Sequence, residues 1–71
     1  MRYHAVVHDL ENDNKTAFEC HVIADNTGAA REAVKTHLRK HDQEDLANMN
    51  ISLVEYREDI ESDLLLINLE R

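Results

Sequence analysis

The sequence contains no proline, no tryptophan, one glycine (Gly28) and one cysteine (Cys20) among its 71 residues. A single cysteine excludes an internal disulfide, so we expect a protein of a reducing compartment, the cytoplasm. One glycine excludes a glycine-rich phosphate-binding loop. Because the chain also lacks a long apolar run and a charged-then-apolar leader, we expect neither a membrane span nor a secretory signal.

The length of the chain limits what the fold can enclose. A chain of this size buries only about 60% of the surface that its unfolded form exposes, and its core leaves little net stability. We therefore expect a single domain over residues 1–71, with room for one sheet, one helix and a shallow surface. Such a domain has little space for a deep substrate pocket, which argues against most classes of enzyme.

The net charge of −7 is unevenly distributed along the sequence. Residues 42–71 contain nine acidic and two basic residues, whereas residues 31–41 contain four basic residues and one acidic residue. An acidic surface repels nucleic-acid phosphates and favours basic protein surfaces. The alternative is that the charge only keeps a small protein soluble.

The segment Asp25–His41 predicts the main helix. Apolar residues recur there at helical spacing, at Ala30, Ala33, Val34 and Leu38. Asp25, Asn26 and Thr27 offer acceptors for the unpaired N–H groups at its start. We expect this helix to cover one face of a sheet.

Two segments before this helix predict a β-hairpin. Arg2–Leu10 and Thr16–Ala24 alternate in polarity, and the polar segment Glu11–Lys15 between them favours a turn. Pairing Leu10 with Lys15 gathers the bulkier apolar residues on one face. That register places Tyr3 opposite Val22, Ala5 opposite Cys20, Val7 opposite Phe18, His4 opposite His21, Val6 opposite Glu19, and His8 opposite Ala17.

The remaining chain predicts two further strands. Asp42–Met49 favours a short helical turn, or a loop held by Leu46 and Met49, and Ile51–Tyr56 is rich in β-branched and aromatic residues. Leu64–Leu69 is almost wholly apolar, which is typical of a strand in a sheet centre or of an edge strand that meets a partner. The expected fold class is α+β: a ββαββ two-layer sandwich with a mainly antiparallel sheet and one covering helix.

Catalytic and metal sites are not indicated by the residue spacing. His37 and His41 have the spacing of a two-ligand helical site, but the residues between them include Arg39 and no glutamate. Cys20 has a strand-core position that fits a buried thiol better than a nucleophile. We therefore expect no catalytic residues, no metal and no cofactor.

Two charged features indicate binding. The first comprises the acidic residues and two apolar anchors between positions 55 and 63, with Asp42, Glu44 and Asp45 as an extension. These candidate partner-binding residues are Glu55, Tyr56, Glu58, Asp59, Ile60, Glu61 and Asp63. Its carboxylates suit a protein groove meant for phosphates, although a solvated turn has the same composition.

The second feature is the basic side of the helix. Its candidate contacts to nucleic acid or to a partner are Arg31, Lys35, Arg39 and Lys40. Because so few cations sit on a net acidic protein, we expect weak, salt-sensitive binding to nucleic acid. Neutralisation of nearby acidic groups is the simpler role for them.

The run Val22–Asn26 followed by Ala29–Val34 resembles the strand-to-helix layout of small phage and prophage proteins. Several anti-CRISPR proteins are similar: they are short, often acidic, and built from a few strands and one helix. The resemblance is one of architecture over the whole chain and implies a protein that occupies a surface of a larger host complex.

Together these observations predict a non-enzymatic module that binds a host protein or complex with a basic surface. The alternatives are a small nucleic-acid-binding domain that uses the helix, and a structural homodimer with no external ligand. A homodimer is also expected from the apolar C-terminal strand, because one helix covers only one of its faces.

Overall fold

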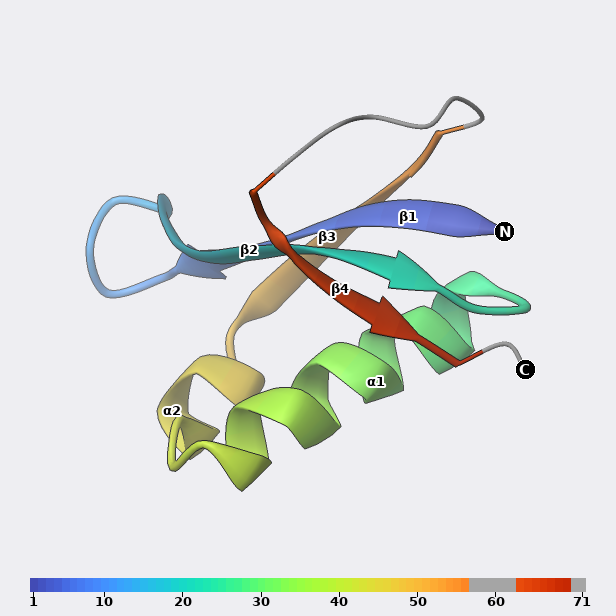
Figure 1. The fold of residues 1–71 in the computed structure, drawn as a ribbon. Helices are drawn as coiled ribbons and strands as arrows, with labels where there is room; N and C mark the ends of the chain where they lie inside the picture. Colours follow the sequence, from blue (N-terminus) through green and yellow to red (C-terminus); the bar gives the residue numbers. More distant parts are fainter. Residues whose placement is uncertain (57–62, 70–71) are drawn as a thin grey trace.

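The computed structural model describes residues 1–56 and 63–69, which form four strands and two helices (Figure 1). One sheet has the strand order β3-β1-β2-β4. β1 pairs antiparallel with both β2 and β3, whereas β4 pairs parallel with β2. The elements are β1 (Arg2–Asp9), β2 (Lys15–Ile23), α1 (Thr27–Lys40), α2 (Glu44–Ala47), β3 (Asn50–Tyr56) and β4 (Leu65–Asn68).

The α+β class is confirmed, and the finer ββαββ description holds only roughly. The sheet is mixed because β4 joins it parallel to β2, and the short helix α2 accompanies α1. β4 is an edge strand of this sheet, so the alternative that places the C-terminal strand in the sheet centre is wrong. Ala47 of α2 is buried, and Leu46 and Met49 pack against the core, as expected for a helical turn held by apolar side chains.

The predicted hairpin register is confirmed from Tyr3–Val22 through Val7–Phe18 and fails at the turn. His8 pairs with Thr16 instead of Ala17, and Leu10 lies in the loop. The backbone N–H groups of Asn12 and Asn14 donate to the carbonyl of Asp9 at 3.2 and 3.0 Å. This turn sets Asp9 opposite Lys15, and an irregularity between Val7 and His8 absorbs the one-residue difference.

Helix α1 begins and ends close to the expected positions. The Asn26 side chain caps its start, since Oδ1 accepts a hydrogen bond from the Ala29 N–H at 2.8 Å. Ala30, Val34 and Leu38 are buried against the sheet, and basic residues occupy the last turn, where the helix dipole favours them.

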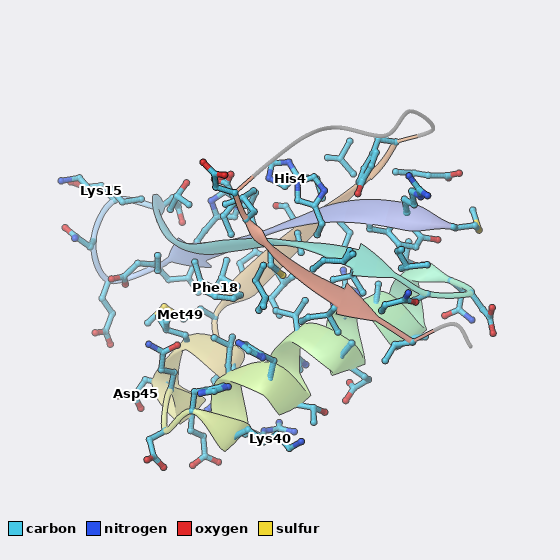
Figure 2. The ribbon with its side chains drawn as sticks, viewed as in Figure 1. His4, Lys15, Phe18, Lys40, Asp45 and Met49 are labelled. Atoms are coloured by element: carbon cyan, nitrogen blue, oxygen red, sulfur yellow. The ribbon has the colours of Figure 1, made fainter. Side chains whose placement is uncertain are left out.

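The two faces of the sheet differ in character. Tyr3, Ala5 and Val7 point into the core beneath α1, where they meet Cys20 and Val22. Figure 2 shows Phe18 on the helix side of the sheet and His4 on the opposite side. The alternation that separated apolar residues from histidines in the sequence therefore separates a covered face from a histidine-bearing face.

Candidate functional site

A polar network crosses the histidine-bearing face of the sheet. Nε2 of His4 lies 3.0 Å from Oε2 of Glu19, and the His4 ring stacks on His21 with ring centres 5.3 Å apart. Nδ1 of His21 lies 2.6 Å from the hydroxyl of Tyr56. The network therefore joins three neighbouring strands, β2, β1 and β3.

His21 is the buried member of this network, with 7% of its surface exposed. Burial lowers the pKa of His21 most strongly, the neighbouring His4 lowers it further, and Glu19 opposes both effects. Because His21 therefore favours the neutral imidazole, its Nδ1 can accept a hydrogen bond from the Tyr56 hydroxyl. This role of Tyr56 was not foreseen, since only the β1–β3 pairing brings residues 21 and 56 together.

Cys20 lies in the core, as the strand pattern predicted. Burial raises the pKa of its thiol to about 11, so the reactive thiolate is scarce at neutral pH. The thiol therefore acts as a small apolar side chain.

His37 and His41 lie together at the end of α1, with ring centres 4.4 Å apart, and His37 also stacks on Phe18 at 5.7 Å. Burial lowers the pKa of His37, and the neighbouring His41 and Lys40 lower it further. Among residues 1–56 and 63–69, no group of three or more potential metal ligands comes together. The His37 ring therefore extends the packing between α1 and β2, and the exposed His41 ring packs on His37.

The predicted partner-binding residues fall into three groups. Glu55 and Asp63 are exposed, whereas Tyr56 is half-buried with its hydroxyl directed to His21. Glu58, Asp59, Ile60 and Glu61 lie outside the described residues. The expected extension at Asp42, Glu44 and Asp45 is exposed but lies beyond the other end of β3 from Glu55, about 20 Å away at the usual strand rise.

The basic candidates lie along α1. Arg31, Arg39 and Lys40 are exposed, and Lys35 is half-buried. Lys40 also lines a groove beside β4. The four basic residues therefore do not form one continuous outward-facing stripe.

An acidic depression lies where the hairpin loop meets α2. It has a volume of about 400 Å³ and is lined by Leu10, Glu11, Asp45, Asn48 and Met49. Asp45 lies on α2, and Met49 lies between α2 and the sheet (Figure 2). No local sequence signal marks this site, because its two carboxylates are separated by more than 30 positions in the chain.

An apolar groove of about 490 Å³ separates α1 from β4. Ala29, Ala33 and His37 form its α1 side, Ile67 and Leu69 form its β4 side, and Glu32, Thr36 and Lys40 complete its lining. In the C-terminal segment, Leu65, Leu66 and Leu69 are 42%, 53% and 50% exposed. The apolar C-terminal strand of the sequence analysis therefore remains largely uncovered within the described residues.

Neither helix that the structure describes has the length and apolar character needed to cross a membrane. Comparisons of the chain with protein-family models, with curated proteins and with solved structures found no significant match.

Proposed function

We propose that this protein is a non-enzymatic protein-binding module that docks on a basic protein surface. The observation that carries this proposal is the acidic depression between the hairpin loop and α2. Its sharpest form is a phage-type inhibitor, similar to anti-CRISPR proteins, that occupies a basic surface of a host nucleic-acid-handling complex. The acidic charge and the architectural resemblance support that form.

The depression has the chemistry of a receptor for a lysine or arginine side chain. Leu10 is 58% exposed and Met49 is half-buried, so together they offer an apolar wall to the methylene stem of such a side chain. Glu11 and Asp45 offer carboxylates to its charged end. The Glu11 and Asp45 side chains make no ion pair among the described residues, so both are available to a partner.

The net charge of the protein adds a longer-range contribution. A charge of −7 on a domain of this size attracts basic surfaces and speeds encounter with them. Glu55 and Asp63 extend the exposed acidic surface away from the depression. Residues 58–61 add further carboxylates in sequence, and Tyr56 or Ile60 remains a proposed apolar anchor for the partner.

The test uses immobilised protein and bacterial lysate proteins preselected on heparin, which enriches basic nucleic-acid-handling surfaces. We expect capture that duplex DNA displaces, because the DNA competes for the same basic surface. Asp45→Lys and Glu11→Lys should each weaken capture about fivefold or more, equivalent to about 1 kcal/mol.

The matched control is Asp25→Lys, which makes the same charge change at an exposed aspartate outside the depression. It should retain most of the capture. Equal capture by the native protein, Asp45→Lys and Glu11→Lys would contradict the proposal, as would captured proteins that DNA does not release.

The same material separates the two rival functions. Direct binding of the purified protein to generic duplex DNA at low salt, lost in Arg31→Glu, would favour the nucleic-acid-binding domain. Self-association with no captured protein would favour the structural homodimer.

A further inference from the structure

We propose that a second copy of this chain pairs antiparallel with β4 about a two-fold axis at Leu66. β4 has a strand neighbour on one side only among the described residues, and that neighbour is β2. This surface is distinct from the acidic depression, so the proposal stands whether or not the proposed function is correct.

The backbone of β4 fixes which residue faces the second copy. The Leu69 N–H donates to the carbonyl of Ile23 in β2 at 2.9 Å. Because the N–H and C=O groups of successive strand residues alternate in direction, those of Leu65 and Ile67 also point to β2. The N–H and C=O groups of Leu66 therefore point away from β2, toward the open side.

Antiparallel pairing at Leu66 makes the interface apolar on both faces. Two copies of Leu66 would exchange both backbone hydrogen bonds, and their side chains would meet on the histidine-bearing face. On the other face, Leu65 of the second copy would lie beside Ile67, at the mouth of the groove between α1 and β4. Leu65 of the second copy would therefore occupy the mouth of this groove.

β4 also lacks the features that protect sheet edges. Its sequence, Leu65–Asn68, contains no charge and no proline, whereas natural edge strands are commonly blunted by such residues. The other edge strand, β3, carries Glu55 near its end and a serine in its middle. Of the two edges, β4 is the one suited to pairing.

Charge favours the antiparallel arrangement over a parallel one. Asp63 precedes Leu66 by three residues, so antiparallel pairing separates the two copies of Asp63 by about 20 Å, beyond the screening length of about 8 Å. Parallel pairing would bring the two copies of Asp63 close together. The helix α1 runs opposite to β4 (Figure 1), so the two-fold axis places Lys40 of one copy at the same end of the joined groove as Glu32 of the other.

The first test is the mass in solution, measured by sedimentation over a concentration series. The native protein should approach twice its 8.2 kDa chain mass at high concentration. Leu66→Lys should remain folded, because the side chain is exposed, and should sediment as a monomer. The matched control Val54→Lys changes a 62%-exposed apolar residue on the other edge strand and should leave the dimer intact.

The second test examines the register by oxidative cross-linking. Leu66→Cys places two thiols opposite each other at a Cα separation of about 5.5 Å, within disulfide range, and should yield a covalent dimer. Asn68→Cys should not cross-link, since its two copies would lie about 14 Å apart along the paired strands. The buried Cys20 should contribute no cross-link in either variant.

A monomer at all concentrations would overturn the proposal. So would a dimer that survives Leu66→Lys, or cross-linking that is stronger at Asn68→Cys than at Leu66→Cys. If Leu66→Lys fails to fold, as judged by circular dichroism, the cross-linking result decides the matter alone. A native monomer that instead captures another protein through β4, in a manner lost in Leu66→Lys, would assign this edge to a different partner and overturn the dimer.

Discussion

The hydroxyl of Tyr56 lies 2.6 Å from Nδ1 of His21, and their rings meet edge to face with centres 5.0 Å apart. The two residues come from β3 and β2, which are not neighbours in the sheet; β1 lies between them. A side-chain contact therefore links strands that share no backbone hydrogen bonds.

Removing this hydroxyl should destabilise the protein. Tyr56→Phe leaves Nδ1 of the buried His21 without its partner, which we expect to lower the free energy of unfolding by about 1–3 kcal/mol. Tyr3→Phe is the control, because the Tyr3 hydroxyl donates to a weak acceptor, the thioether of Met1, at 3.5 Å. Urea unfolding of both variants measures the difference. Equal decreases in the free energy of unfolding would show that the hydrogen bond between Tyr56 and His21 does not contribute the expected stability.

Stability should fall as the pH drops below about 6.5, the usual pKa of a histidine in an unfolded chain. Burial lowers the pKa of His21 in the folded protein, so between the two pKa values the unfolded chain binds a proton that native His21 does not. This contribution is complete above the unfolded pKa and is lost as the pH falls toward the folded one. The lowered pKa of His37 acts in the same direction.

Urea unfolding at pH 7.5 and pH 5.5 tests this dependence. The native protein should be less stable at pH 5.5, and His21→Gln and His37→Gln should each reduce the difference between the two pH values. A native free energy of unfolding that is equal at both values would contradict the assignment.

Within the core, Leu38→Ala should cost more than Phe18→Ala. The Leu38 side chain is fully buried, and deleting such a side chain to alanine costs about 2–5 kcal/mol, comparable to the whole stability of a small domain. Phe18 is only half-buried and keeps part of its surface in water, so its loss should fall below the roughly 3–5 kcal/mol typical of a buried phenylalanine. Thermal melting gives the order, and a larger loss at Phe18 would reverse our assignment of the core centre.

The start of α1 should depend on Asn26. Asn26→Ala removes the acceptor for the Ala29 N–H and should cost about 1 kcal/mol. Asp25→Ala, one residue earlier and exposed, should change stability by less than about 0.5 kcal/mol. Denaturant midpoints compare the two, and an equal effect would remove the capping role.

Folding and partner binding should need no metal. The prediction rests on the incomplete sets of histidine ligands recognised in the sequence, with His37 and His41 as the closest pair. After dialysis against a chelator, elemental analysis should find less than one equivalent of zinc or iron per chain, with the circular dichroism spectrum unchanged. Stoichiometric metal that survives this treatment would refute it.

Local alternation was sufficient to predict the hairpin from Tyr3 to Val7, because a one-residue slip would have moved Phe18 and Val22 to the other face. The period of α1 was equally informative, since Ala30, Val34 and Leu38 recur on one side. These patterns depend on neighbours in the chain or across one turn.

What alternation does not contain is the order of distant strands. The parallel pairing of β4 with β2, and the proximity of Glu11 to Asp45, depend on where β3 and β4 join the sheet. Predicting that Tyr56 is the hydrogen-bond partner of His21 also depends on where β3 joins the sheet. Consequently the acidic depression was missed, and the composition of the C-terminal strand predicted a strand without deciding between the sheet centre and an edge.

Local detachment of β4 should open the surface around it faster than the whole protein unfolds. Within one chain, β4 spans four residues and has β2 as its one strand neighbour among the described residues, whereas β1 is held between two strands. We expect detachment of β4 to leave the hairpin, β3 and the packing around Leu38 in place. It is therefore a sub-global opening, with a free energy below that of complete unfolding. Amide protons of Ile67 and Leu69 would then exchange with solvent through this opening long before those of β1. The lifetime of the groove beside α1 is therefore governed by the fraying of one short strand, and a denaturation midpoint does not measure it.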